Sequence, residues 1–151
     1  MTRWIIGLAL AGTALVVASS LAFVLGWGGG LAGGCRNTVV STARSPDGRL
    51  DAVLFERNCG ATTGFSTQVS IMSVGELPEV SGNIFVTDDD VPQGERGKWG
   101  GAWADVQWFS ERRLHVVHAP AARLLKSLDR FGEVDITYGT AHAPRRSGSP
   151  H

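Results

Sequence analysis

The hydrophobic positions of this chain follow two patterns, one before and one after a glycine-rich stretch at residues 26–34. Residues 4–35 contain no charged side chain, and residues 4–25 are almost entirely apolar, without a polar face. A helix that packs within a soluble domain normally carries a polar face, so lipid is the expected surrounding of this one. From Trp4 to Trp27 such a helix would span roughly 36 Å at about 1.5 Å per residue, enough to cross a membrane.

The pattern predicts that residues 1–27 form a short cytoplasmic start and a single transmembrane signal-anchor helix. Trp4 and Trp27 are the expected membrane-interface anchors, because tryptophan is enriched at both boundaries of the hydrocarbon core. Arg3 precedes the apolar run and favours a cytoplasmic amino terminus. Residues 28–37 are the expected glycine-rich linker, and the domain after it is then extracytoplasmic. A cleaved signal peptide, the competing interpretation, normally has a shorter apolar region of about 7–15 residues.

A third interpretation concerns residues 31–35, Leu-Ala-Gly-Gly-Cys, which resemble the lipobox of bacterial lipoproteins. In a lipobox a small residue precedes a cysteine that becomes lipidated, so the chain would be anchored through Cys35 instead of a helix. The match departs from the usual pattern, because Ala32 stands where a large aliphatic residue is typical. The long apolar segment and the glycine spacer also favour the signal-anchor.

Small residues form a stripe along the predicted transmembrane helix: Gly7, Ala11, Ala14, Ala18 and Ala22. Stripes of this kind let two helices pack closely, which predicts a weak homodimer through this segment. An alanine-rich apolar helix also produces such stripes by chance, so both interpretations stay open.

Beyond the linker the pattern changes to an alternation of apolar and polar residues in short runs. These runs predict strands at residues 50–55, 65–71, 83–86, 102–108, 114–118 and 134–138. Alternation buries one face of a strand and exposes the other, which is typical of antiparallel sheets. The predicted fold class is therefore mainly β: a single transmembrane helix followed by a small antiparallel sheet domain at residues 38–141, meander or sandwich-like, with one short helix.

The short helix is predicted at residues 120–131, where the apolar residues share one helical face: Ala121, Leu124, Leu125, Leu128 and Phe131. Pro120 suits a first helical turn and Gly132 suits a helix end. An edge strand with a long loop is the alternative. Residues 88–101 are polar and glycine-rich and predict a long loop, and residues 142–151 predict a disordered tail.

Charge and cysteine content limit the classes of function that the predicted domain can have. The chain has 14 basic and 14 acidic residues and no basic block that would indicate nucleic-acid binding. Two cysteines, Cys35 and Cys59, indicate a disulfide in an extracytoplasmic domain. A lipidated Cys35 would exclude this bridge, so the two interpretations compete for one sulfur atom. The histidines show no metal-ligand spacing, and neither a metal nor another cofactor is expected.

A long motif runs from Ser45 to Ile71. It contains the turn Ser-Pro-Asp-Gly at residues 45–48 and, after the next predicted strand, Cys-Gly-Ala-Thr-Thr at residues 59–63. Together with later elements such as Asn-Ile-Phe at residues 83–85, this motif resembles an uncharacterised family of small bacterial envelope proteins, over most of residues 35–139. The resemblance implies one β-rich domain behind a membrane anchor or a lipoprotein signal. It implies no activity, so it assigns no catalytic residue.

The best candidate for a ligand or partner site is the loop around the second cysteine: Gly60, Thr62, Thr63, Gly64 and Ser66. Its glycines give the backbone conformational freedom, and its hydroxyl groups can form hydrogen bonds to a ligand or partner. The structural alternative is that these hydroxyl groups satisfy the loop's own backbone beside the disulfide. Residues 88–90, three aspartates, could bind a hard cation but lack the spacing of a calcium loop. Trp99 and Trp103 could offer aromatic platforms, or cover a sheet face.

Catalysis requires a nucleophile beside a base, or paired carboxylates, and no motif in the sequence links such residues. An enzyme is therefore not expected. The predicted function is a membrane-tethered extracytoplasmic β domain that serves as a binding or protein-interaction module of the bacterial cell envelope. Its predicted partners are the lipid bilayer and an envelope protein, not nucleic acid. Two alternatives stay open: a lipoprotein with the same domain, and a small envelope hydrolase.

Overall fold

The computed structural model of the chain describes residues 34–60 and 64–144. The predicted transmembrane helix with Trp4 and Trp27, its stripe of small residues, Thr62, Thr63 and residues 145–151 lie outside these ranges. In the described part, no helix has the length and apolar character needed to cross a membrane.

Strands dominate the described residues, as the alternating pattern predicts, and the mainly β fold class is confirmed. In chain order the strands are β1 (Arg36–Arg44), β2 (Leu50–Asn58), β3 (Phe65–Ser73), β4 (Phe85–Thr87), β5 (Ala104–Ser110), β6 (Arg113–His118), β7 (Leu124–Ser127), β8 (Arg130–Phe131) and β9 (Val134–Thr140). A short 3-10 helix, η1 (Gln93–Glu95), lies between β4 and β5. The predicted strands overlap β2, β3, β4, β5, β6 and β9. Strand β1 was not predicted, and it begins at Arg36, inside the range expected to be a linker.

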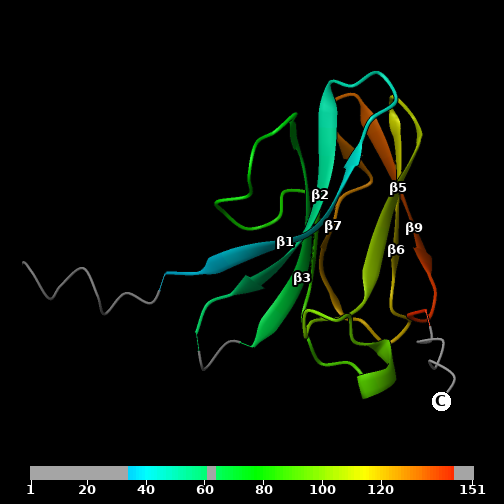
Figure 1. Cartoon of the computed structure of the whole chain (residues 1–151). Coiled ribbons are helices and arrows are strands. Elements are labelled where there is room, and N and C mark those ends of the chain that lie inside the picture. Colours follow the sequence, from blue (N-terminus) through cyan, green and yellow to red (C-terminus); the bar gives the residue numbers. More distant parts are fainter. Residues whose placement is uncertain (1–33, 61–63, 145–151) are drawn as a thin grey trace, which may run out of the picture. The chain divides into compact units, whose positions relative to one another are not determined.

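The strands form two sheets that face one another across a shared core (Figure 1). The first sheet has the order β1-β2-β3-β4-β7, and the second has the order β5-β6-β9-β8. Both sheets contribute to the core: Ala52, Leu54, Val69, Ile71, Ile84 and Phe85 on one side, and Ala104, Val106, Leu114, Val116, Val134 and Ile136 on the other. Alternate residues of a strand point to the same side, so these positions form one apolar layer between two sheets, as in a sandwich.

The second sheet is mixed, which corrects the prediction of a purely antiparallel domain. Strands β6 and β9 pair in parallel, with Leu114 opposite Ile136, whereas the other strand pairs are antiparallel. The reason is the path of the chain between them. After β6 the chain crosses to the edge of the first sheet as β7, returns as β8, and turns back as β9 beside β6. The Tyr138 hydroxyl of β9 donates a hydrogen bond to the Leu128 carbonyl oxygen at 2.8 Å. This bond connects β9 to the segment between β7 and β8.

The helix predicted at residues 120–131 is wrong, because the chain forms β7 and β8 there. Strand β4 offers an unpaired edge, and β7 fills it, with Phe85 opposite Ser127 and Val86 opposite Lys126. The apolar residues of this segment do not share one buried face, and Leu124, Leu125, Leu128 and Phe131 remain 37–58% exposed. A helix of about three turns has little stability of its own, so pairing with a neighbouring strand overrides the local pattern.

The outer face of the first sheet is also covered, although the alternating pattern predicts it to face water. Val53 and Phe55 point away from the second sheet and are still buried. The segment between β3 and β4, the green loop beside the sheet in Figure 1, lies over this face. Asn37 of β1 donates hydrogen bonds to the carbonyl oxygens of Pro78 and Val80, at 2.8 and 3.0 Å. These bonds fix the loop against the sheet.

Candidate functional site

The predicted pairing of the two cysteines is confirmed. Cys35 and Cys59 form a disulfide across 24 positions of the sequence. Cys35 precedes β1 and Cys59 follows β2, and the register of the two strands places Arg36 opposite Asn58. The bridge therefore closes the open end of this strand pair. It also uses the sulfur atom that lipidation of Cys35 would require.

The described residues of the predicted ligand loop are bound within the domain. Gly60 donates its backbone N–H to the Asn58 side chain at 2.9 Å. The Ser66 hydroxyl lies 3.3 Å from the Arg57 carbonyl oxygen and accepts a hydrogen bond from Gln68 at 2.7 Å. These contacts support the structural interpretation of Ser66. The remaining hydroxyl groups of the loop, on Thr62 and Thr63, lie outside the described residues.

Gly64 allows a close approach between the predicted loop and the aspartate run. Its φ of +63° favours glycine, and a Cβ atom there would lie 2.8 Å from the Asp89 carboxylate. The same carboxylate accepts a hydrogen bond from the Phe65 backbone at 3.3 Å. Asp88 instead pairs with Arg123 at 2.6 Å. Within the described ranges, no group of three or more histidine, cysteine or acidic side chains could hold a metal ion.

Trp99 is a structural residue more than an exposed platform. Its indole N–H donates to the Thr67 hydroxyl at 2.9 Å, and that hydroxyl donates to the Ala102 carbonyl oxygen at 2.7 Å. A hollow of about 1220 Å³ lies beside Trp99 and Trp103. Two cations line it, Arg96 and Lys98, and Arg96 binds the backbone carbonyl oxygens of Asp89 and Gly100. Because these polar groups hold the loop together, this hollow is the weaker of two candidates.

The stronger candidate is a cleft of about 460 Å³ at the opposite end of β2, which we call the turn cleft. Three turns meet there: residues 45–49 before β2, residues 111–112 before β6 and residues 132–133 before β9. The end of β3 completes the wall. The lining residues are Arg49, Leu50, Ile71, Met72, Ser73, Glu76, Glu111, Arg112, Phe131, Gly132, Glu133 and Val134.

The turn cleft combines an apolar floor with a charged rim. Ile71 and Val134 come from opposite sheets and belong to the core, and Leu50 packs against it. The cleft is therefore the place where the apolar layer between the sheets reaches the surface. Its charged lining residues come from the turns and from the segment after β3, which lie outside the strands.

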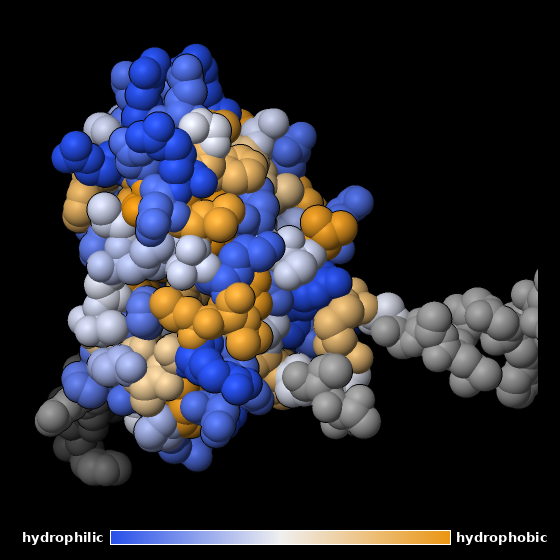
Figure 2. Space-filling model, turned by 180° about the vertical axis from the view of Figure 1, so that it is seen from behind, coloured by the Kyte–Doolittle hydropathy of each residue, from blue (hydrophilic) through white to orange (hydrophobic). Residues whose placement is uncertain are grey.

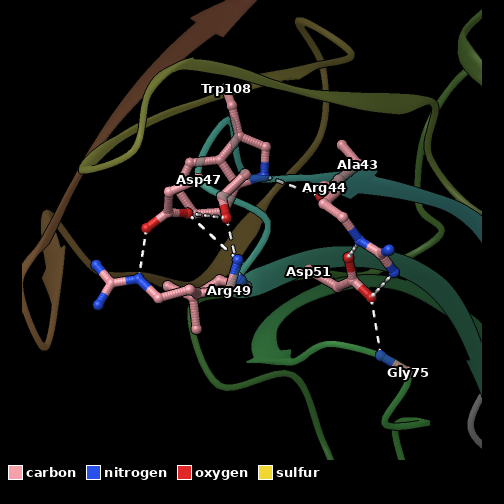
Figure 3. A network of polar contacts seen from close by, with 9 residues as sticks. Ala43, Arg44, Asp47, Arg49, Asp51, Gly75 and Trp108 are labelled. Atoms are coloured by element: carbon pink, nitrogen blue, oxygen red, sulfur yellow. Dashed lines mark hydrogen bonds and ion pairs between the residues drawn. The ribbon is translucent and has the colours of Figure 1, made fainter.

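The Ser45–Arg49 turn holds one cation at the rim (Figure 3). Gly48 takes a φ of +71° at the tip of the turn, a conformation that glycine adopts without strain. The Ser45 hydroxyl donates to Asp47 at 2.6 Å, and Arg49 pairs with the other Asp47 oxygen at 2.6 Å. These two hydrogen bonds, that from Ser45 being the larger cause, lower the pKa of Asp47 to about 2. The Asp47 carboxylate is therefore charged at neutral pH and pairs with Arg49, whose side chain is 74% exposed.

A second network fixes the wall of the turn cleft (Figure 3). Arg44 of β1 binds both oxygens of Asp51 in β2, at 3.0 and 3.2 Å. The Gly75 backbone N–H, from the segment after β3, donates to the same carboxylate at 3.0 Å. The hydrogen bond from Arg44, and then that from Gly75, lowers the pKa of Asp51. Asp51 is buried. Its carboxylate joins β1, β2 and the segment after β3.

Carboxylates outnumber guanidinium groups around the turn cleft. Arg112 pairs with Glu133 at 3.4 Å, and Glu76 accepts a hydrogen bond from the Ser73 backbone at 3.1 Å. Among the described residues, the Glu111 carboxylate makes no ion pair. Asp47 is the largest cause of the raised pKa of Arg49, and Glu111 and Glu133 raise it further from a greater distance.

Sequence reasoning missed the turn cleft. The available signal was that each of its turns places charged residues beside an apolar strand: Arg49 before Leu50, Arg112 before Leu114, and Glu133 before Val134. The sequence does not show that these turns meet, because that depends on strand order and on the parallel return of β9.

No family model, curated protein or solved structure matches this chain. The resemblance to the family of envelope proteins therefore stays a prediction. The features of this chain that bear on its function are the disulfide, the β-sandwich and the turn cleft.

Proposed function

We propose that the chain is a membrane-tethered binding module of the bacterial cell envelope, with its β domain outside the cytoplasm. The observation that carries the proposal is the disulfide between Cys35 and Cys59. Structural disulfides form and persist in oxidising compartments and are rare in the cytosol. The uncharged apolar segment at residues 4–27 supports the tether.

Binding is favoured over hydrolysis by the surroundings of the histidines on β6. His115 is 2.8 Å from the Thr137 hydroxyl and stacks on Phe109 at the surface. His118 is buried, with its Nδ1 atom 2.9 Å from the Ala119 carbonyl oxygen. Neither histidine lines the turn cleft. The cleft offers an apolar floor and a charged rim, an arrangement that supports a recognition role.

The test is the intact mass of the membrane-extracted chain, measured with and without reduction before thiol alkylation. The expected result is a chain that retains residues 4–27, with both thiols blocked until reduction. Protease added to intact spheroplasts should then remove the β domain, because it lies outside. A chain that begins at a diacylated Cys35, with Cys59 free to alkylate, would establish the lipoprotein alternative instead. A domain that only lysis exposes to protease would overturn the proposed location.

A further inference from the structure

We propose that the turn cleft binds an extended peptide segment in which a large apolar side chain stands next to a lysine or arginine. This inference rests on the proposed function and deepens it, since it names the chemistry of the partner. A protein of the cell envelope with such a segment at an accessible position would be the partner.

The floor of the turn cleft fits an apolar side chain. Ile71 and Val134 are 3% exposed and Leu50 is half-buried, so the floor has little contact with water. A volume of about 460 Å³ lies within the usual range of roughly 300–1,000 Å³ for ligand pockets. An apolar side chain that covers this floor would extend the layer between the two sheets, and removal of its surface from water would favour binding.

The charges at the rim favour a basic neighbour for that side chain. The lining contains Glu76, Glu111 and Glu133 against two arginines, and each arginine already has a carboxylate partner: Asp47 for Arg49, and Glu133 for Arg112. Because Glu111 makes no ion pair within the part of the chain that the structure describes, it can accept a cation from a ligand. A ligand with a carboxylate at this point would meet like charge.

The wall of the turn cleft favours an extended backbone over a compact molecule. Phe131 belongs to β8, a strand of two residues at one edge of the second sheet. An edge strand presents backbone groups to which an extended segment can bind. Exposed leucines continue from Phe131 back along the chain, namely Leu128, Leu125 and Leu124. Figure 2 shows hydrophobic residues among hydrophilic ones on the side where β7 runs, which a longer peptide could also contact.

The turn cleft is remote from the disulfide. Cys35 is bound to Cys59 just beyond the end of β2. The cleft is at the start of β2, and the eight residue steps from Leu50 to Asn58 span roughly 27 Å at about 3.4 Å each. The cleft and the disulfide are therefore at opposite ends of this strand pair.

The test uses the full chain in detergent micelles with ¹³C-labelled isoleucine methyl groups. Ile71 lines the turn cleft and reports on binding, while Ile84 in the core serves as the internal reference. The probe is acetyl-Ala-Leu-Lys-Ala-amide, compared with acetyl-Ala-Leu-Glu-Ala-amide and acetyl-Ala-Ala-Lys-Ala-amide. The Leu-Lys peptide should shift the Ile71 methyl signal in a saturable manner, and both comparison peptides should bind more weakly.

Charge variants test the rim. The double variant Glu111→Gln, Glu133→Gln should weaken binding of the Leu-Lys peptide by about two- to fivefold for each charge removed. Glu79→Gln, an exposed position away from the cleft, is the matched control and should bind as the wild type does.

Three results would overturn the inference. They are the absence of an Ile71 shift, equal binding of the Leu-Lys and Leu-Glu peptides, and an Ile71 shift produced by transfer from micelles into a lipid nanodisc, which would make the bilayer the occupant. None of these results bears on the proposed membrane anchor, which the mass and protease experiments test separately. A cytoplasmic location would in turn overturn the proposed function whatever the peptides do.

Discussion

Trp108 of β5 donates its indole N–H to the carbonyl oxygen of Ala43 in β1, over 2.9 Å and across 65 positions of the sequence (Figure 3). The two strands are edge strands of different sheets. This single bond therefore connects the two layers of the sandwich along one side. Ala43 also precedes Arg44, so the bond holds the strand that positions Asp51 beside the turn cleft.

Trp108→Phe tests this connection. The substitution keeps an aromatic ring but removes the donor, which leaves the Ala43 carbonyl oxygen without its side-chain partner. We expect the free energy of unfolding to fall by about 1–2 kcal/mol, measured by urea unfolding of the full chain. Leu77→Ala, at a position that is 70% exposed, is the control and should change stability by less than about 0.5 kcal/mol. Equal stability of Trp108→Phe and wild type would show that the bond does not join the sheets energetically.

The carboxylates of Asp47 and Asp51 should make stability depend on pH in acid. The pKa of Asp47 is about 2 in the folded chain, and that of Asp51 is also lowered, whereas an unfolded aspartate has a pKa of about 3.9. The unfolded state therefore binds more protons between these values. The stabilisation is complete above about pH 4 and is lost as the pH falls toward about 2.

Asp51→Asn should reduce this acid dependence and lower stability near neutral pH by about 2 kcal/mol, because Arg44 and Gly75 lose a charged acceptor. Urea unfolding at about pH 7 and about pH 2.5 measures both effects. Asp105→Asn, at an exposed position of β5, should leave stability near pH 7 within about 0.5 kcal/mol of wild type. The assignment fails if Asp51→Asn loses as much stability on acidification as the wild type does.

The Thr67 hydroxyl should contribute more to the free energy of unfolding than the methyl group of the same side chain does. It accepts from Trp99 and donates to Ala102, and it is fully buried. Thr67→Val keeps the shape of the side chain but leaves both hydrogen-bond partners unsatisfied, and we expect the free energy of unfolding to fall by about 2–3 kcal/mol. Thr67→Ser keeps the hydroxyl and should lose only about 1 kcal/mol for the missing methyl group. Thermal unfolding ranks the two variants, and a valine variant at least as stable as the serine variant would contradict this role.

Reduction of the disulfide should lower stability by about 3 kcal/mol, because the bridge restricts the unfolded chain across 24 positions. Urea unfolding with and without reductant measures the difference. The paired variant Cys35→Ser, Cys59→Ser should match the reduced wild type and no longer respond to reductant. An unfolding midpoint that reductant leaves unchanged in the wild type would contradict the stabilising role.

Much of the fold could be predicted because alternation is a local signal. Strands β5, β6 and β9 bury one side of each run in the core, and their sequences show it, whereas β2 and β3 are buried on both sides. Strand β1 could not be predicted in this way, since it is a mostly exposed edge with a bulge between Val39 and Ser41. The segment at residues 120–131 misled the prediction because its apolar spacing fits a helix, while the free edge of β4 that captures it is not visible in the sequence.

The candidate site could be predicted only in part, because contacts between distant segments are not visible in the sequence. Cys35 and Cys59 could be paired from the sequence, because the chain has no other cysteine. The turn cleft needs Ile71 and Val134 to meet across two sheets, 63 positions apart by their numbers. Only the order of the strands brings them together, and that order is set by pairing between distant segments.

The place of β9 has a consequence for how the protein is made. It is the last of the described strands, yet it lies inside its sheet, between β6 and β8. Until residues 134–140 are present, β6 therefore keeps an open edge. A product shortened before β9 would lack Val134 from the turn cleft and would expose unpaired backbone of β6, which invites aggregation and proteolysis. Only a chain that includes β9 can form the turn cleft, so a fragment that ends before residue 134 lacks both the cleft and the completed second sheet.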